Sequence, residues 1–467
     1  MAHASLTSHP WFFCGIGGSG MLPLALILRG HGAQVAGSDR SRDQGRTLEK
    51  FAWLESLGFA LFPQDGSGIV SPAQTLVASA AVEDTVPEVV RAAQLGCPRM
   101  SRAQLLAALF NAAPQSIAVG GTSGKSTVTG MVGWIITAAG RDPTIMNGAV
   151  MKNFASPDAP FASARVGGGN VFVSEVDESD GSIALYNPTV AVLNNISLDH
   201  KSLEELHVLF ADFLTKSQVA VINADDDESA PFRALDHAIC FGFRSDLREQ
   251  DFRAYDFNDL PDGSRFMVEH EGRSCEVNLQ VPGHHNALNA LAAMAAASAA
   301  GVPVSDAVSA LGTFAGLARR FDIVGTSASG ITVIDDFGHN PDKVAATLAT
   351  LKAHPGRVIA FFQPHGYGPL RQMGPELAHV LAGRLGADDV VILCDPVYFG
   401  GTVDRSVGSE RIVELVNAAS GHALYVPVRE DAADRIAAMA RPGDRVVIMG
   451  ARDDTLPAFA RTLLARL

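Results

Sequence analysis

The sequence predicts an α/β protein of three domains, each built around a parallel sheet. Two glycine-rich segments, residues 15–20 and 120–126, each follow a short apolar run and precede an apolar helical pattern. Strand, glycine turn and helix in this order begin a βαβ unit. A third series of apolar runs alternates with helical patterns after residue 323. At 467 residues the chain is too long for one ordinary core, so several domains are expected.

The first segment, residues 1–112, opens with a buried strand at residues 11–14. The motif G-x-G-x-x-G follows before a helix at 21–28, and a second strand at 33–36 ends near Asp39. The candidate ligand contacts here are Gly15, Gly17, Gly18, Ser19, Gly20 and Asp39. An acid at this spacing can hold a ribose, so a nicotinamide or flavin nucleotide is possible, but a UDP pyrophosphate suits the helix N-terminus equally well.

The rest of the first segment completes an α/β unit. We expect a strand at 75–78, helices at 87–95 and 102–110, and a linker at 112–114.

The second segment begins with a phosphate-binding pattern. A strand at 116–119 precedes Gly121, Thr122, Ser123, Gly124, Lys125, Ser126 and Thr127, and a helix is expected over 128–139. Small residues let backbone N–H groups surround a polyphosphate, while lysine supplies a charge and serine a ligand for Mg²⁺. Val119 replaces the first glycine of the strict pattern, so the match is to a shorter G-T-x-G-K-S form. The pattern predicts ATP or GTP binding, against the alternative of a glycine turn before a helix.

Acidic and histidine side chains follow two further strands of this segment. The run 171–174 leads into Glu175, Asp177, Glu178 and Asp180, and the strand 190–193 precedes His200. Carboxyl ends of parallel strands gather ligands, so we expect Glu175 to hold a metal ion and His200 a second one. The alternative for the acids is a solvated loop.

Polar side chains also open a long alanine-rich helix after residue 283. His285, Asn286 and Asn289 project from its N-terminus, which suits a contact with adenine or phosphate. A helix cap with a glycine turn is the equal alternative.

The last segment alternates strands with helices. Strands are expected at 357–362, 389–393 and 445–449, and helices at 342–353, 373–385 and 409–418. Residues 450–454, which end the last strand, should face the active cleft.

Composition limits the partners and the compartment. The formal charge of −14 disfavours nucleic acid and anionic membranes, and no apolar run reaches the roughly 20 residues of a membrane span. Five cysteines without C-x-x-C spacing indicate neither a zinc site nor a disulfide framework. No secretory signal is visible at the N-terminus. We expect a cytoplasmic monomer or homodimer.

The ordered set of motifs resembles the Mur ligase family of ATP-dependent, amide-forming enzymes of peptidoglycan synthesis. Three further segments carry the resemblance, at 319–321, 335–341 and 362–365. The chain is most similar to members that join an amino acid or a murein peptide to a UDP-muramoyl carboxylate. The resemblance implies a UDP-sugar domain at 1–112, an ATP domain at 113–322 and an amino-substrate domain at 323–467. In that family ATP phosphorylates the carboxylate, and the amine attacks the acyl phosphate.

The resemblance also implies residue roles. Lys125 would stabilise the transferred phosphoryl group, Ser126 and Glu175 would hold one Mg²⁺, and His200 would hold another. Nucleotide contacts would come from Gly121, Thr122, Gly124, Thr127, His285, Asn286, Asn289, Arg320 (phosphates) and Asp335 (ribose).

Departures from the family pattern concentrate on the acceptor side. The family segment H-R-Y-T-R, whose arginines are expected to hold an amino acid carboxylate, is replaced by 365–369 without either arginine. The remaining acceptor candidates are His339, His365 and Arg371, and Arg371 would reach the site only through an unusual loop. Serine stands at 123 where histidine is usual in alanine-adding members. Lys216 lies near the position of a carbamylated lysine in other members, but its spacing from His200 differs, which favours a surface lysine. The acceptor could be an amino acid, a peptide or another amine.

Two other function classes agree with parts of the sequence. A nicotinamide-dependent oxidoreductase would use residues 15–20 and Asp39, but it leaves Lys125, Glu175 and His200 unexplained. A nucleotide-binding regulator without a reaction would explain the altered acceptor segment.

Overall fold

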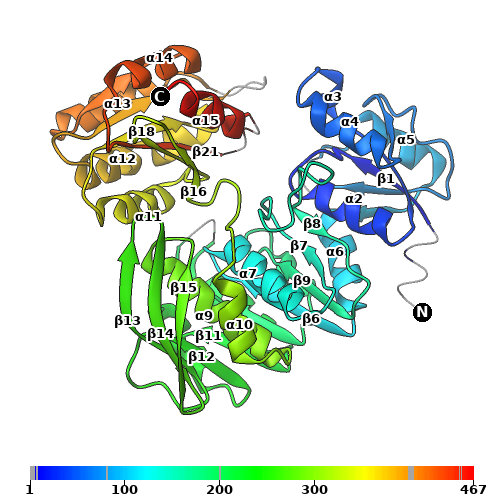
Figure 1. Cartoon of the computed structure of the whole chain (residues 1–467). Coiled ribbons are helices and arrows are strands. Elements are labelled where there is room, and N and C mark those ends of the chain that lie inside the picture. The colour runs from blue at the N-terminus through cyan, green and yellow to red at the C-terminus, as the bar shows by residue number, and fades with distance from the viewer. Residues whose placement is uncertain are drawn as a thin grey trace. The chain divides into compact units, whose positions relative to one another are not determined.

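The structure is a computed structural model that describes residues 6, 9–79, 82–198, 201–397, 404–451, 453 and 455–467 (Figure 1). Two compact units are formed, one by residues 1–258, 264–280 and 284–316, the other by 259–263, 281–283 and 317–467. The first unit contains two sheets and the second contains one. The predicted α/β class with parallel sheet cores is confirmed. In the described part of the chain, no helix combines the length and apolarity that a membrane crossing requires.

The first sheet has five parallel strands in the order β3-β2-β1-β4-β5. Its strands are β1 (Pro10–Cys14), β2 (Gln34–Ser38), β3 (Ala60–Phe62), β4 (Thr75–Ala78) and β5 (Arg99–Ser101). Its helices are α2 (Met21–Gly30), α3 (Arg40–Asp43), α4 (Leu48–Ser56), α5 (Pro87–Leu95) and α6 (Arg102–Asn111). Trp11 and Phe13 enter one core and Phe12 and Cys14 the other, which is why this central strand is a continuous apolar run.

The second sheet has ten strands in the order β15-β14-β13-β12-β11-β10-β6-β9-β7-β8. These strands are β6 (Gln115–Gly120), β7 (Thr144–Met146), β8 (Ala164–Arg165), β9 (Val171–Glu175), β10 (Val190–Leu193), β11 (Val219–Asn223), β12 (Ala238–Gly242), β13 (Phe252–Leu260), β14 (Gly263–His270) and β15 (Arg273–Leu279). The helices are α7 (Lys125–Ala138), α8 (Leu203–Thr215), α9 (His284–Ala299) and α10 (Val304–Leu311), with 3₁₀ turns η1 (Ser182–Leu185) and η2 (Asp227–Ala234). β6 lies between β9 and β10, all parallel, so three loops meet at one edge.

The strands β13, β14 and β15 were not predicted from the sequence. β14 and β15 pair antiparallel, and β13 exposes every second residue over its later half. Polar side chains on the solvent face dilute the apolar signal of such strands, whereas the buried parallel strands keep it.

The third sheet has six strands in the order β16-β17-β21-β18-β19-β20, and only β16 is antiparallel to its neighbour. The strands are β16 (Asp322–Thr326), β17 (Thr332–Asp336), β18 (Val358–Gln363), β19 (Val390–Leu393), β20 (Ala423–Tyr425) and β21 (Arg445–Gly450). One core contains α11 (Pro341–Lys352), α12 (Tyr367–Arg384) and α13 (Ser409–Ala418), and the other contains α14 (Arg429–Met439) and α15 (Leu456–Leu464). The helices therefore cover both faces of this sheet.

The expectation of a loop over 365–371 was wrong. α12 begins at Tyr367, six residues before the predicted start, so Pro369 lies in the first turn of the helix. N–H groups in a first turn have no intrahelical acceptor, and proline is tolerated there for that reason. Arg371 is consequently a helical residue, with its side chain paired to Asp404 at 2.8 Å.

Asp389 connects three segments of the third sheet. Its carboxylate accepts the backbone N–H groups of Val358 and Gly386 and the ammonium of Lys352, each at 2.7 Å. Burial raises the pKa of Asp389, but the hydrogen bonds from Lys352, Val358 and Gly386 outweigh it and leave the pKa below its ordinary value. This carboxylate therefore stabilises the sheet in its ionised form.

We predict that Asp389→Ala lowers the free energy of opening of β18 by about 2–4 kcal/mol, because two buried N–H groups lose their acceptor. Amide hydrogen exchange of the peptide containing Val358 should accelerate accordingly. Since the folded pKa is depressed, the difference from the parent should be full above about pH 4 and shrink as pH falls through the folded value. Asp388→Ala, one position away and exposed, is the control. Equal exchange in both variants would contradict the role of Asp389.

Candidate active site

The phosphate-binding pattern forms a tight loop between the buried strand β6 and the helix α7. Gly124 caps α7 with φ of 82°, a backbone conformation that favours glycine. A Cβ atom at this position would lie 2.4 Å from Asn194 Nδ2 and 2.6 Å from Asn289 Oδ1. The N–H groups of the first turn, at residues 125–127, have no acceptor within the helix. The loop therefore has the backbone geometry and the dipole that suit a phosphate.

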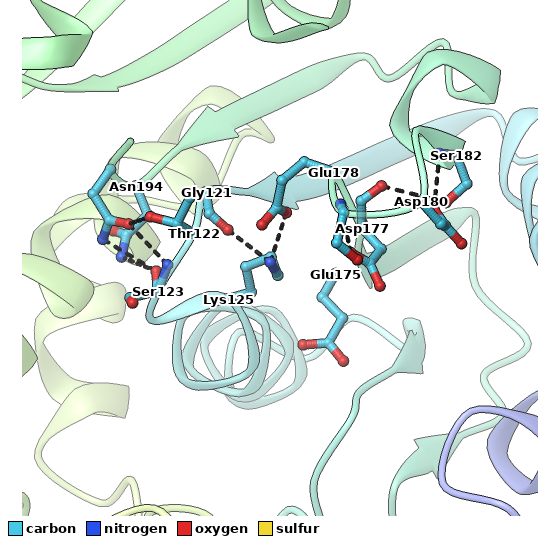
Figure 2. A network of polar contacts seen from close by, with 12 residues as sticks. Gly121, Thr122, Ser123, Lys125, Glu175, Asp177, Glu178, Asp180, Ser182 and Asn194 are labelled. Atoms are coloured by element: carbon cyan, nitrogen blue, oxygen red, sulfur yellow. Dashed lines mark hydrogen bonds and ion pairs between the residues drawn. The ribbon is translucent and has the colours of Figure 1, made fainter. Parts of the chain in front are cut away.

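Lys125 is held between the loop and the acidic segment after β9. Its ammonium donates to Gly121 O and to Glu178 Oε2, each at 2.7 Å (Figure 2). Glu178 is only 4% exposed. Burial raises its pKa, and the charge of Lys125 opposes that shift. Lys125, which in a phosphate-binding loop would contact the nucleotide phosphates, therefore pairs with the carboxylate of Glu178 in this structure.

Glu175, the predicted metal ligand, lies beside the serine of the loop. Ser126 Oγ donates to Glu175 Oε2 at 2.7 Å, and Glu175 ends the strand next to β6. A hydroxyl and a carboxylate are oxygen ligands of the kind that Mg²⁺ accepts with several waters. Among the described residues there is no group of three or more His, Cys, Asp or Glu side chains that could hold a metal by themselves. The pair fits Mg²⁺ bound largely by water and phosphate.

Asn194 and Asn195, which were not predicted as site residues, form hydrogen bonds with the phosphate loop. Asn195 Oδ1 accepts from Thr122 Oγ1 at 2.9 Å and from the Ser123 N–H at 2.8 Å. Asn194 Nδ2 donates to Ser123 O and to Asn289 Oδ1, both at 3.0 Å. Asn194 and Asn195 directly follow β10, and this position at the carboxyl end of a parallel strand is the sequence feature that could have identified them as site residues.

The N-terminus of α9 reaches the loop through Asn289, which accepts from Asn194. Asn289 Nδ2 donates to Asn286 Oδ1 at 3.2 Å, and both side chains are buried. His285 is exposed at the start of the helix, and Thr127 is half-buried in the first turn of α7. The structure brings Asn286 and Asn289 to the phosphate loop, whereas His285 faces solvent.

The glycine turn of the first sheet also has helix geometry suited to an anion. Gly15 adopts φ of 77°, and Gly20 caps α2 without a side-chain bond. Asp39 accepts the Gly17 N–H on one oxygen and the Ser41 N–H on the other, each at 2.8 Å. Both carboxylate oxygens of Asp39, the residue expected to bind a ribose, therefore already accept hydrogen bonds from backbone N–H groups. Gly18 and Ser19, between Gly17 and Gly20, are exposed.

The structure does not place three nucleotide or metal candidates relative to the phosphate loop. Arg320 and Asp335 belong to the second unit, where Arg320 stacks over Phe337 at 4.5 Å. Asp335 is 2% exposed beside Arg319, and burial raises its pKa to about 6. His200 lies outside the described residues.

The acceptor candidates His339 and His365 meet in the second unit. Their ring centroids are 5.1 Å apart and the rings are nearly perpendicular, and both residues line a small groove between β18 and the start of α12. Arg371 does not line this groove and is bonded to Asp404. Asp453, in the segment predicted to face a cleft, forms an ion pair with Arg429.

Lys216 has the contacts of a charged surface lysine. Its ammonium donates to Ala184 O at 2.9 Å and pairs with Asp212 at 2.5 Å, one helical turn earlier. The surface interpretation of this lysine therefore agrees with the structure.

Three protein-family models match the chain in succession. Residues 12–113 match the model described as Mur ligase family, catalytic domain; residues 119–297 match the Mur ligase middle domain; and residues 319–452 match the Mur ligase, glutamate ligase domain.

Relatives of similar length agree with these models. Enzymes named UDP-N-acetylmuramate--L-alanine ligase are 34% identical in Geobacter sulfurreducens, over 94% of both chains, and 35% identical in Clavibacter michiganensis, over 94% of this chain and 90% of the relative. The crystal structure of a UDP-N-acetylmuramate-alanine ligase from Thermotoga maritima superposes with a TM-score of 0.80 at 26% identity, covering 98% of this chain and 99% of the other. The motifs at 15–20, 121–127 and 335–341 thus occur within a full-length match, and the chain belongs to the Mur ligase family.

Proposed function

We propose that this ATP-dependent Mur ligase joins the carboxylate of UDP-N-acetylmuramate to an amine. The observation that carries the proposal is the contact of Lys125 with both Gly121 O and Glu178 Oε2, which puts a cation between a phosphate loop and an acidic strand end. ATP use follows from the family. The donor is proposed because relatives at 34% identity carry it in their names.

The chemistry requires activation of a poor acylating agent. A carboxylate would have to expel oxide, and bound ATP supplies the phosphoryl group that turns this oxygen into part of a phosphate leaving group. Lys125 and the N–H groups of α7 would neutralise the charge that gathers on the transferred group. Asn194, Asn195 and Asn289 hold the loop in shape for this purpose.

Mg²⁺ is part of the proposal. Ser126 and Glu175 would hold it, and it would bring phosphate and carboxylate anions together by lowering their repulsion. His200 remains the candidate for a second ion. His285, Arg320 and Asp335 remain candidates for nucleotide contacts.

The donor would occupy the first sheet and the amine the second unit. Residues 15–20 offer a helix N-terminus for the pyrophosphate, with Asp39 shaping the turn through Gly17. The model that matches residues 319–452 is described as a glutamate ligase domain, which supports an amine site there. Division of these roles among residues 1–112, 113–322 and 323–467 belongs to the same proposal.

A cytoplasmic location completes the proposal, since all five cysteines are free thiols and the donor is a nucleotide sugar. The protein is proposed to act as a monomer or homodimer.

The proposal predicts that Lys125→Ala lowers donor-dependent ADP release by about a hundredfold to a thousandfold, because charge on the transferred phosphoryl group loses its main cationic partner. ADP release is measured with saturating ATP, Mg²⁺, UDP-N-acetylmuramate and hydroxylamine as a general nucleophile. Lys216→Ala, a charge deletion at the C-terminus of α8 in the same unit, is the matched control and should behave like the parent. An active Lys125→Ala enzyme would exclude the proposed role of the loop.

A second prediction separates the two glutamates. Glu175→Gln should raise the Mg²⁺ concentration for half-maximal activity by about tenfold or more, because an amide is a weaker ligand for a hard cation. Glu178→Gln removes the same charge three residues away, but it should instead lower the KM for ATP by freeing Lys125. Mg²⁺ titrations and ATP titrations of both variants test the assignment, and it fails if Glu178→Gln alone alters the Mg²⁺ requirement.

A further inference from the structure

A cation lies where the donor turn, residues 15–20, meets the acidic segment, residues 175–180. Arg102 is the first residue of α6, and its Nη2 lies 3.9 Å from Asp180 Oδ2. The same side chain passes along Gly20, because a Cβ atom on Gly20 would lie 2.9 Å from Arg102 Cδ and 3.4 Å from Nη1. Gly20 ends the donor turn and caps α2. The guanidinium therefore lies between the donor turn and the acidic segment.

The guanidinium of Arg102 has few partners within the protein. Its side chain is 25% exposed, and the 3.9 Å to Asp180 exceeds hydrogen-bond distance. Within the residues that the structure describes, no acceptor takes a hydrogen bond from it. Its planar fork of N–H donors is therefore available for a ligand that carries several acceptor oxygens.

Arg102 occupies an unfavourable position in the helix that carries it. The N-terminus of α6 already has a complete capping box, formed by Ser101 and Gln104, and the helix dipole is positive at this end. An arginine at the first helical residue is repelled by that dipole. Residues that break a local rule in this way are typical of functional sites. An anion beside Arg102 would be attracted by the side chain and by the N-termini of α6 and α2 together.

A second cation at the donor turn has a different role. Lys50 donates to Gly17 O at 3.2 Å and is 8% exposed, and Asp39 accepts the N–H of the same glycine. Both side chains therefore hold the backbone of the turn at Gly17. Arg102 lies at the other end of the turn, at Gly20, where its side chain is partly exposed.

The acidic segment connects Arg102 with the phosphate loop. Asp180 faces Arg102, whereas Glu178, two residues earlier, pairs with Lys125 at 2.7 Å (Figure 2). Arg102 is thus on the side of the donor turn toward the phosphate loop. The carboxylate end of the donor has to arrive on this side, because it receives the phosphoryl group of ATP there.

From these contacts we infer that Arg102 is a specificity-determining residue that binds the sugar-linked phosphate of the donor diphosphate. The inference deepens the proposed function and rests on it. The nucleoside-linked phosphate would lie toward Gly17, and the sugar-linked phosphate would lie against the fork of Arg102. The fork would exchange Asp180 for phosphate oxygens, in a bidentate contact that a lysine cannot make. Arg102 would thereby select a diphosphate over a monophosphate and direct the sugar toward the phosphate loop.

The test measures binding rather than turnover. The full-length protein is saturated with Mg²⁺ and a non-hydrolysable ATP analogue, which occupy the phosphate loop, and UDP and UMP are each titrated by calorimetry. Arg102→Gln should raise the Kd for UDP by about tenfold or more, because hydrogen bonds to a charged phosphate are lost, and it should change the Kd for UMP much less. Arg102→Lys, which keeps the charge but not the fork, should fall between. A structural effect alone would weaken both ligands equally, so an unchanged ratio of the two Kd values overturns the inference.

Arg99→Gln is the matched control for charge. Arg99 lies three residues earlier, is 42% exposed and pairs with Asp84 at 2.7 Å. The control removes the same charge from the same domain and should leave the ratio of the UDP and UMP Kd values unchanged. An equal change of the ratio in both variants would reduce the effect to net charge and would contradict a specific contact from Arg102.

A substitution at Gly20 supplies an independent measurement. Gly20 has φ of −95°, so alanine fits its backbone, and the three atoms nearest to the new Cβ all belong to Arg102. Gly20→Ala should therefore weaken UDP binding by displacing Arg102, and it should have no further effect in the Arg102→Gln protein. Additive losses in the double variant would show that Gly20 acts without Arg102 and would overturn the inference.

Failure of the proposed function gives a different result. If the parent protein does not bind UDP, the proposed donor is wrong and the inference falls with it. If the parent binds UDP and forms hydroxamate from UDP-N-acetylmuramate and hydroxylamine, while Arg102→Gln keeps the parent's ratio, only the role of Arg102 is wrong.

Discussion

Close approach at Gly124 is the constraint on which the site depends. The phosphate loop, the end of β10 and the start of α9 converge there so tightly that a Cβ atom would meet Asn194 and Asn289 at 2.6 Å or less. Only glycine allows this contact and the positive φ together. From this point the hydrogen bonds of Asn194 and Asn289 fix α9 against the loop, and the first turn of α7 is left with N–H groups that an anion can use.

Electrostatic contacts with two carboxylates stabilise the phosphate loop. Lys125 satisfies its charge with Glu178, and Ser126 bonds to Glu175, so the cation and the hydroxyl each have a carboxylate partner. The same segment contains Asp177, whose pKa lies below its ordinary value. Burial raises this pKa, but hydrogen bonds from Ser179 and the charge of Lys125 outweigh the effect of burial. The phosphates of a nucleotide would compete with Glu178 for Lys125, and Mg²⁺ would compete with the Ser126 proton for Glu175.

The sequence predicted those parts in which local pattern and packing agree. The central strands of each sheet, the two glycine turns and the helices that follow them are continuous apolar or glycine signals, and they lie within a few residues of the predicted bounds. Strands with a solvated face, such as β14 and β15, gave too weak a signal. The start of α12 was missed because Gly366, Gly368 and Pro369 are typical of loops, yet a first helical turn accepts them. The ion pairs could not be predicted from the distance between residues in the sequence. Lys125 pairs with Glu178, and Arg371 pairs with Asp404, because of how separate elements pack.

The central claim is that the protein activates a carboxylate by moving one of its oxygens onto phosphate. It is tested most directly with UDP-N-acetylmuramate whose carboxylate carries ¹⁸O at both oxygens, together with unlabelled ATP, Mg²⁺ and hydroxylamine. Inorganic phosphate is then analysed by mass spectrometry. The account predicts one ¹⁸O in each released phosphate, with the second label retained in the hydroxamate. Phosphate released without ¹⁸O would show that ATP is hydrolysed without activation of the donor, and it would contradict the account.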